Sequence, residues 1–421
     1  MNICVIGLGY IGLPTAAFLA TSGFRVHGVD VDVDVVAMVN RGSAKTHEPD
    51  LDVLVKSAVN SGNLIATTTP IPADVFLIAV PTPLGEDHTP DLSNIESATK
   101  AIAPHLASGD LIILESTCPV GATEDLARNI THQRPDLRVA GNGSDSSMGK
   151  PIGDQIFVAH CPERVLPGQI LHELVCNDRV VGGVDEDSTE RAAAFYEQFV
   201  RGRVLRTDAR TAELAKLAEN TFRDVNIAFA NELSSVCGVL AIDVWNLIDL
   251  ANCHPRVNIL MPGPGVGGHC IAVDPWFIVS SAPSATSLIP AARYVNDSVP
   301  EAVVQRVLAA TESVAEPRIA CLGLSFKPDV DDLRLSPAIK VVQSLGQRNL
   351  GEILVVEPHI ETLPAGLQSQ GQVKLIRLDE ALERANIVVA LVKHRSFSVI
   401  TPADLQGAVV IDTVGMLPTV P

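Results

Sequence analysis

Gly7-Leu8-Gly9-Tyr10-Ile11-Gly12 decides the fold, because this stretch joins a short apolar run, Asn2–Ile6, to an apolar helical segment. GxGxxG in that setting is typical of a dinucleotide-binding turn, which places a pyrophosphate at a helix N-terminus. Asp30 lies 18 positions after Gly12, at the end of the next apolar run, where a carboxylate can bond the ribose hydroxyls. An acid there also repels a 2′-phosphate, so the sequence predicts NAD rather than NADP.

Strand-like apolar runs alternate with helical stretches along the chain, which predicts an α/β fold with parallel sheets. The expected strands are Asn2–Ile6, Arg25–Val29, Val75–Val80, Leu111–Glu115, Ile156–Ala159 and Arg179–Val181, then 318–324, 353–358, 387–392 and 408–413. Residues 211–250 predict long helices, and Ala282–Pro290 predicts a loop. We therefore expect two Rossmann-like, doubly wound domains joined by a helical middle: an NAD-binding domain (1–205), a central helical, dimerisation and catalytic domain (206–305) and a C-terminal UDP-binding domain (306–421).

Composition restricts the classes of partner. The 421-residue chain has a net charge of −18, which argues against binding to nucleic acid or to an anionic membrane. Eight scattered cysteines lack CxxC pairs or metal-ligand spacing, so we expect reduced thiols and no metal. The apolar N-terminus lacks a basic segment and contains three glycines, so we expect no signal peptide and a cytoplasmic protein.

The glycine-rich segment 261–275 carries the candidate chemistry. Its glycines would bring backbone close to a neighbour and expose Cys270, a candidate nucleophile with Asp274 four residues later. A thiol beside an NAD site suits aldehyde oxidation, because a thiohemiacetal can give up a hydride. The sequence thus indicates a four-electron oxidation of an alcohol to a carboxylate.

Two further segments place polar groups near apolar sequence. Glu213, Lys216, Asn220 and Arg223 recur at helical spacing, which predicts one polar face, either a buried stripe or a solvated surface. Residues 161–168, CPERVLPG, follow an expected strand and contain Glu163.

These motifs resemble those of the UDP-glucose/GDP-mannose dehydrogenase family over essentially the whole chain. GLGYIGLP, PTP, ESTCPVG, CPERVLPG, ELAKLAEN, GPGVGGHC and GLSFKPDVDDLR occur in family order. The family oxidises the C6 hydroxyl of nucleotide sugars with two NAD per turnover. NDRVVGG, ANCHPRVNIL and GPGVGGHCIAVDPWF are most similar to the branch that acts on UDP-N-acetyl-D-mannosamine, and Val273 replaces the Lys typical of the glucose branch.

The resemblance implies roles for individual residues. Cys270 would be the nucleophile, Lys216 and Asn220 would stabilise and position the reacting oxygen, Asp274 and Thr117 would order water, and Glu163 would assist thioester hydrolysis. The expected cofactor contacts are Gly7, Gly9, Tyr10, Ile11, Gly12, Asp30, Thr82, Thr123 and Arg334. The expected substrate contacts are Arg164, Val165, Lys216, Asn220, Arg223, His254, Arg256, Gly267 and Lys327.

Leu335 departs from the family pattern, in which a Glu often follows the Arg that matches Arg334. The family's Arg at 256 reaches across a dimer interface, so a homodimer is expected, and the uronate product implies a role in surface polysaccharide assembly.

Three other interpretations stay open from sequence alone. The substrate could be UDP-N-acetylglucosamine, UDP-N-acetylgalactosamine or UDP-glucose, since few contacts distinguish sugar epimers. A two-electron β-hydroxyacid dehydrogenase shares the Rossmann and helical domains but needs neither Cys270 nor a second α/β block. A non-catalytic NAD-binding sensor would need no Lys216, Cys270 or Asp274.

Overall fold

The computed structural model describes residues 1–44, 48, 50–139, 154–165 and 168–418, which form two compact units. Unit 1 comprises Met1–Glu219 with Trp276–Pro283, and unit 2 comprises Asn220–Pro275 with Ser284–Pro421. The division falls within the long helix α8 (Ala209–Leu240), which therefore contributes residues to both units. No helix among the described residues is long and apolar enough to cross a bilayer.

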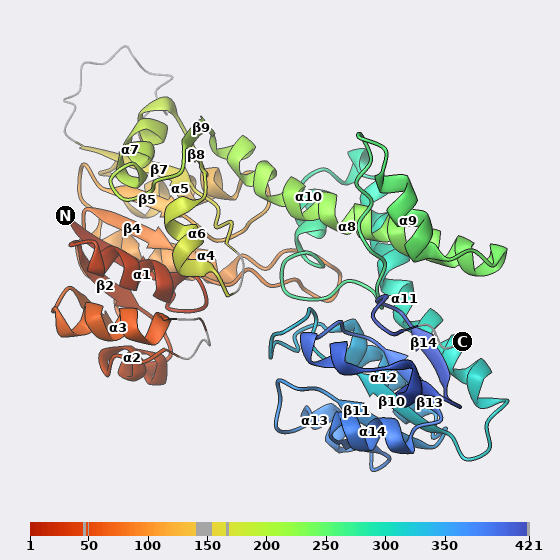
Figure 1. Ribbon diagram of the computed structural model, residues 1–421. Helices are drawn as coiled ribbons and strands as arrows, with labels where there is room; N and C mark the ends of the chain where they lie inside the picture. The colour runs from red at the N-terminus through yellow and green to blue at the C-terminus, as the bar shows by residue number, and fades with distance from the viewer. Residues whose placement is uncertain (45–47, 49, 140–153, 166–167, 419–421) are drawn as a thin grey trace. The chain divides into compact units, whose positions relative to one another are not determined.

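Unit 1 is built on a nine-stranded sheet with the order β3-β2-β1-β4-β5-β7-β8-β9, in which β6 pairs with β7 (Figure 1). All neighbouring strands are parallel except β7 and β8. Chain order reverses between β1 and β4, where a doubly wound sheet binds its ligand. The strands are β1 (Asn2–Ile6), β2 (Arg25–Val29), β3 (Leu64–Thr67), β4 (Val75–Ile78), β5 (Leu111–Leu114), β6 (Arg138–Val139), β7 (Gln155–His160), β8 (Arg179–Gly183) and β9 (Val204–Asp208).

Helices cover both faces of this sheet, and alternate residues of β1 enter two separate cores. Ile3 and Val5 pack with α1, α3 and α7, whereas Cys4 and Ile6 pack with α4 and α5. Burial on both faces explains the continuous apolar runs that predicted these strands. The helices of unit 1 are α1 (Gly12–Thr21), α2 (Val33–Asn40), α3 (Leu51–Asn60), α4 (Ser93–Ile102), α5 (Ala122–Gln133), α6 (Ile170–Cys176) and α7 (Glu186–Tyr196).

Unit 2 contains a second sheet of five parallel strands in the order β12-β11-β10-β13-β14. Its strands are β10 (Arg318–Leu322), β11 (Glu352–Val356), β12 (Val373–Leu375), β13 (Ile387–Ala390) and β14 (Val409–Asp412). Its helices include α9 (Val244–Asn252), α11 (Leu288–Thr311), α12 (Pro337–Gln347), α13 (Ala365–Gln368) and α14 (Leu378–Arg384), while α10 (Asp274–Ser281) spans the second division point.

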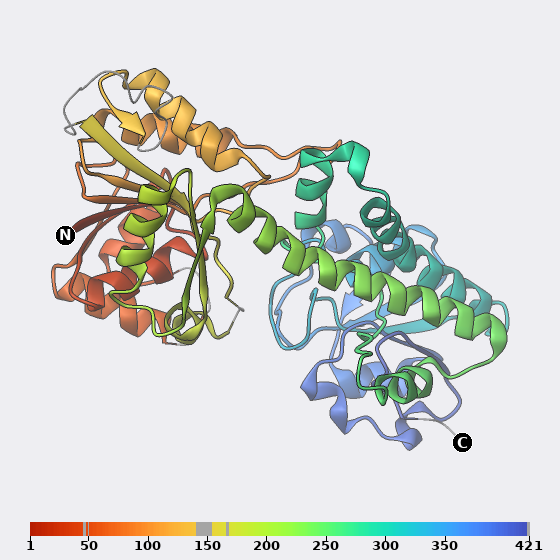
Figure 2. The same ribbon diagram turned by 90° about the horizontal axis from the view of Figure 1, so that it is seen from above.

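Helices α8 and α11 lie side by side in unit 2 and are joined by a buried polar network (Figure 2). The Nη1 of Arg293 donates to Asp224 Oδ1 at 2.6 Å, and Asn231 donates to Asn296 at 2.9 Å. Both partners of the ion pair are almost completely buried, so removing either would leave an uncompensated charge. The network fixes the register of the two helices.

The predicted α/β class with two doubly wound sheets is confirmed, and three local expectations change. β8 extends the sheet as expected, but it runs antiparallel to β7 and not parallel. Four strands were missed: β3, β9 and β12 lie at sheet edges, and β6 has two residues that pair with β7 alone. The loop expected at Ala282–Pro290 ends early, since α11 begins at Leu288 and accommodates a proline in its first turn. The expected boundaries at 205 and 305 stay predictions.

Candidate functional site

The turn after β1 has the geometry that its glycines predict. Gly7 has φ +93°, and its N–H donates to Val29 O at 2.8 Å. A Cβ at Gly7 would overlap the carbonyl of Ala79, and one at Gly12 would overlap the carbonyl of Gly7. These two glycines are required by the protein's own packing at the start of α1.

Gly9 differs, because a Cβ there would meet no protein atom within 4 Å. The protein's own packing therefore does not require glycine at this position, which fits close approach by a dinucleotide. Tyr10 and Ile11, both half-buried, complete the turn before α1. Asp30 follows β2, and its two oxygens accept the amides of Leu8 at 2.9 Å and Asp32 at 3.0 Å. The carboxylate is thereby tied to the turn, and this residue set fits NAD.

Thr82 and Thr117 meet at the carboxyl ends of neighbouring strands β4 and β5. The hydroxyl of Thr82 donates to the backbone carbonyl of Thr117 at 2.6 Å, and Thr82 is buried. The two predicted site residues therefore support the same edge of the sheet.

Thr123 has a different environment, because it is fully buried at the start of α5. Its amide and hydroxyl both donate to Glu213 Oε1, at 2.8 and 2.6 Å, and Glu213 Oε2 accepts the Gly121 amide at 2.6 Å. A carboxylate at a helix N-terminus satisfies otherwise unpaired amides and the helix dipole. Glu213 thus caps α5, a role that its helical spacing with Lys216 did not reveal.

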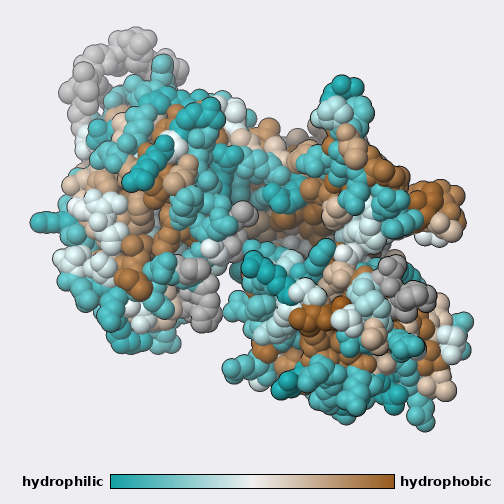
Figure 3. Space-filling view, viewed as in Figure 1, coloured by the Kyte–Doolittle hydropathy of each residue, from teal (hydrophilic) through white to brown (hydrophobic). Residues whose placement is uncertain are grey.

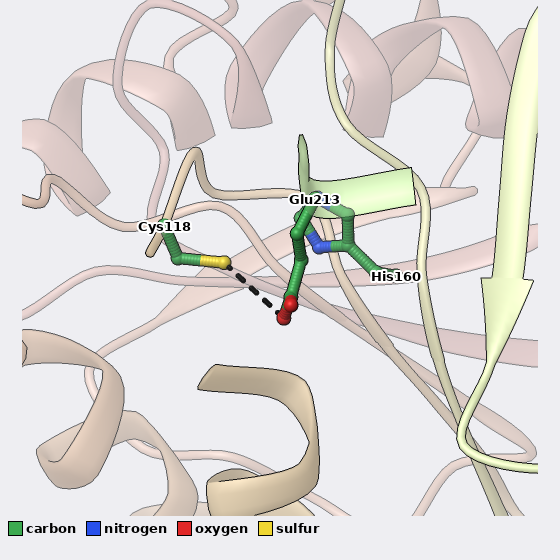
Figure 4. A group of neighbouring side chains, drawn as sticks. All are labelled: Cys118, His160 and Glu213. Carbon is green, nitrogen blue, oxygen red and sulfur yellow. Dashed lines mark hydrogen bonds between the residues drawn. The ribbon is translucent and has the colours of Figure 1, made fainter. Parts of the chain in front are cut away.

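Cys118, His160 and Glu213 point toward one another inside unit 1 (Figure 4). Their potential ligand atoms lie within 4.8 Å of one another, and the thiol of Cys118 is 3.8 Å from Glu213 Oε1. Burial lowers the pKa of His160 to about 3, so this imidazole is neutral. Because the Glu213 oxygens already accept the α5 amides, we assign the group to capping rather than to a metal.

Glu163 belongs to a buried ionic network in unit 1. Its Oε2 lies 3.1 Å from Arg179 Nη1, and its Oε1 accepts the Arg164 amide at 2.6 Å. Arg179 also donates to Leu174 O and is 2% exposed. Both oxygens of Glu163 are therefore held in place, which gives a candidate base a fixed orientation.

Glu115 lies in the same network, at the end of β5. It accepts a hydrogen bond of 2.7 Å from the hydroxyl of Tyr196, and its other oxygen is buried without a hydrogen-bond partner. Burial, together with repulsion from Glu163, raises the pKa of Glu115 to about 7. Burial likewise raises the pKa of Cys161 to about 12, so this thiol stays protonated. Sequence reasoning missed Glu115 and Arg179, although a charge at the end of an apolar strand was a usable signal.

Arg164 and Val165 follow Glu163 in the same loop. Arg164 pairs with Glu219 through Nη2 at 2.5 Å and Nε at 3.1 Å, and its Nη1 donates to Asp178 O. Val165 is half-buried. If Arg164 contacts the substrate, its guanidinium would bind both the substrate and Glu219.

Unit 2 holds the candidate nucleophile. Cys270 is exposed, and its carbonyl accepts the Asp274 amide at 2.8 Å, which closes a turn leading into α10. Asp274 is 3% exposed, and its Oδ2 accepts a hydrogen bond of 2.5 Å from Asn220 Nδ2 on α8. Cys270, Asp274 and Asn220 are therefore brought together from two segments. Lys216, one helical turn before Asn220, is half-buried.

The glycines before Cys270 pack against the loop after β10. A Cβ at Gly267 would meet Leu335 O and Pro337, and one at Gly268 would meet the ring of Phe326 at 2.8 Å. The neighbour expected for these glycines is thus a loop of the second α/β block. Arg334 in that loop forms a two-point ion pair with Asp332, from Nε to Oδ1 and from Nη2 to Oδ2, and the Leu335 that departs from the family pattern has φ +51°.

The remaining predicted substrate residues all lie in unit 2, except Lys216, which is in unit 1. Arg223, His254 and Arg256 are exposed, whereas Lys327 is half-buried in the turn after β10. The contact roles of all these residues stay predictions.

A doubly wound sheet with this glycine turn and its acidic partner defines an NAD-binding domain. Three domain models of the UDP-glucose/GDP-mannose dehydrogenase family match the chain: the NAD binding domain at 1–200, the central domain at 210–298 and the UDP binding domain at 320–419. The chain belongs to this family, as its motifs predicted, and it catalyses NAD-dependent oxidation of a UDP-sugar.

Several relatives are similar over nearly their full length. NDP-N-acetyl-D-galactosaminuronic acid dehydrogenase of Ralstonia nicotianae is 57% identical, over 99% of this chain and 96% of the relative. UDP-N-acetyl-D-mannosamine dehydrogenase of Campylobacter jejuni is 53% identical, over 94% of this chain and 96% of the relative. The solved structure of the UDP-D-ManNAc dehydrogenase of Pyrococcus horikoshii has a TM-score of 0.87 at 38% identity, covering 100% of this chain and 97% of that one.

Proposed function

We propose that the protein oxidises the C6 hydroxyl of UDP-N-acetyl-D-mannosamine to the uronate in two successive NAD-dependent steps. The observation that carries this proposal is the turn in unit 2, where the backbone carbonyl of exposed Cys270 accepts the amide of buried Asp274 and Asn220 holds the Asp274 carboxylate. A nucleophilic thiol next to a fixed acid suits the aldehyde-to-acid step, which an ordinary alcohol dehydrogenase does not perform.

The residues of unit 1 support cofactor binding in this proposal. Gly9 and the N-terminus of α1 would receive the pyrophosphate, and Asp30 would receive the ribose hydroxyls. Bound NAD supplies the hydride acceptor for both oxidations. Thr82 and Thr117, hydrogen bonded to each other, would line the same edge of the sheet.

The first oxidation needs a proton acceptor and charge stabilisation. Lys216 is a cation that would stabilise the developing alkoxide, and Asn220 would orient the reacting oxygen. The carboxylate of Asp274 would order the water that takes up the proton.

The second oxidation uses the thiol of Cys270. Its thiolate adds to the aldehyde carbon to form a thiohemiacetal, and loss of hydride converts this adduct to a thioester. Water then attacks the thioester, releasing the carboxylate product and regenerating the thiol. Glu163, whose oxygens are held by Arg179 and the Arg164 amide, would take the proton from that water.

UDP-N-acetyl-D-mannosamine is proposed because several relatives at 51–53% identity carry that name. UDP-N-acetyl-D-galactosamine is the second candidate, since the relative at 57% identity is named for the galactosaminuronic acid. Arg223, His254, Arg256 and Lys327 would supply positive charge for the diphosphate in an acidic chain. A cytoplasmic site and a role in making surface polysaccharide precursors complete the proposal.

We propose further that the active form is a homodimer assembled through unit 2. Phe222, Phe229 and Val236 recur every seven residues on α8 and are 67%, 51% and 46% exposed. Residues at that spacing form one stripe on a helix, which suits packing against a second helix. Apolar side chains also gather at the C-terminal end of α8, where Val239 is 87% exposed (Figure 3).

Light scattering tests the dimer. The native chain is expected at twice its 44.6 kDa, and Phe229→Glu is expected to shift it to the monomer. Ile71→Glu, at an exposed apolar position in unit 1, is the matched control and should stay dimeric. A monomeric native chain, or a dimer unaffected by Phe229→Glu, would refute the interface.

Direct assay of sugar nucleotides tests the activity. NADH formation with UDP-N-acetyl-D-mannosamine, UDP-N-acetyl-D-galactosamine, UDP-N-acetylglucosamine and UDP-glucose should show a preference of at least about tenfold in kcat/KM for the first. A preference for the galacto epimer would keep the reaction and replace the sugar.

A further inference from the structure

The turns after β1 and β10 have the same backbone construction, although only the first carries GxGxxG. Gly7 and Gly323 have φ +93° and +95°, and each donates to the last residue of the adjacent strand, Val29 or Val356, at 2.8 Å. The next amide in each turn then donates to an acid. Leu8 reaches Asp30 at 2.9 Å, and Leu324 reaches Glu357 at 2.7 Å.

The two acids differ in what else they bind. Asp30 is half-buried, and among the described residues its carboxylate accepts the backbone amides of Leu8 and Asp32. Glu357 is 4% exposed, and its Oε2 also receives the Ser325 amide at 3.0 Å and lies 3.1 Å from His394 Nε2. Its carboxylate is therefore occupied by the protein at the place where a dinucleotide site presents it to ribose.

His394 connects this acid to the far end of the turn. It follows β13, the neighbour of β10 on the side opposite β11, and is 2% exposed. Its Nδ1 accepts the Asp329 amide at 3.0 Å, so Nε2 carries the proton that Glu357 accepts. Glu357 thus holds the Leu324 end of the turn 324–329, and His394 holds the Asp329 end.

Lys327 lies inside that turn. The Ser325 hydroxyl donates to the Lys327 carbonyl at 2.7 Å, and Asp329 is further fixed by the Arg395 amide and guanidinium. Ser325 Oγ approaches the same His394 nitrogen that Glu357 binds, at 3.4 Å, so these three residues do not form a nucleophilic relay.

We infer that Glu357 and His394 are positioning residues that hold the Lys327 turn for the nucleotide half of the substrate. The same contacts withdraw the acid from ribose recognition, so this turn serves the uridine nucleotide and not NAD. The inference rests on the proposed function, in which Lys327 contacts the UDP-sugar. The turns after β1 and β10, which share one backbone construction, would therefore bind different ligands.

Titration calorimetry with UDP and with NAD tests the inference on the full-length protein. His394→Phe removes both hydrogen bonds and keeps an aromatic ring, and it should weaken UDP binding about tenfold. The Kd for NAD and the kcat at saturating substrate should change less than about twofold, while KM for the UDP-sugar rises. His359→Gln is the matched control, because that ring lies 5.0 Å from His394 and approaches the turn only through its Nε2, 4.0 Å from Asp329 Oδ1.

A conservative variant separates positioning from general damage. His394→Gln keeps a donor for Glu357 and should lose less UDP affinity than His394→Phe. Unchanged UDP binding in a folded His394→Phe, or equal weakening of UDP and NAD, would overturn the inference. Lys327→Ala with unchanged UDP affinity would instead refute the substrate contact in the proposed function, whatever the His394 variants show.

Discussion

Glu115→Gln is expected to increase the free energy of unfolding of unit 1 more at alkaline pH than at acidic pH. Glu115 is 3% exposed, and burial raises its pKa from an ordinary 4.5 to about 7. An acid with a raised pKa holds its proton more tightly in the folded state, so its contribution to stability is lost as pH rises from 4.5 to 7. At 1.36 kcal/mol per pKa unit, the native carboxyl costs about 3 kcal/mol above pH 7.

Glutamine keeps the acceptor for the Tyr196 hydroxyl and cannot ionise. The difference in free energy of unfolding between variant and native chain should therefore rise by about 2–3 kcal/mol between pH 5 and pH 8. Urea unfolding measures it, with Trp245→Phe as background so that Trp276, the other of two tryptophans, reports on unit 1. Glu86→Gln, at an exposed carboxylate in the same unit, should change by less than about 0.5 kcal/mol. A pH-independent effect of Glu115→Gln would refute the assignment of a buried, mostly protonated carboxyl.

Three further predictions concern the chemistry. Lys216→Met removes the cation but keeps an unbranched side chain, and kcat should fall about 10²–10³-fold with little change in NAD affinity; a loss below tenfold would contradict the oxyanion role. Cys270→Ser should stop the reaction at the aldehyde stage, detected as a carbonyl trapped with hydrazine, whereas uronate formed at the native rate would exclude the thioester. Asp30→Asn should raise KM for NAD about tenfold and narrow the preference for NAD over NADP, measured by initial rates with both cofactors; an unchanged preference would show that Asp30 does not select the ribose.

Sequence patterns predicted what depends on short stretches of chain. The turn at Gly7 and the acid at Asp30 are 23 positions apart, and their geometry is dictated by one βαβ unit, so both could be predicted. The apolar runs of β1 and β10 were also sufficient to predict these two strands, because a strand buried on both faces is apolar at every position.

Contacts between distant segments could not be predicted in the same way. Helical spacing placed Glu213 on a face with Lys216, but only the fold brings it to the N-terminus of α5, 90 positions earlier in the chain. Glu357 and His394 are 37 positions apart in unremarkable sequence, and their pairing depends on the strand order of the second sheet. Helical spacing left open whether the face that carries Arg223 is buried or solvated, and the structure shows that Arg223 is exposed.

The most direct test of the account is the number of NADH molecules formed per sugar nucleotide consumed, with the reaction run to completion on UDP-N-acetyl-D-mannosamine. The account predicts two NADH and one equivalent of uronate, because both oxidations occur on one chain through the Cys270 thioester. One NADH per sugar, with an aldehyde as the final product, would contradict it.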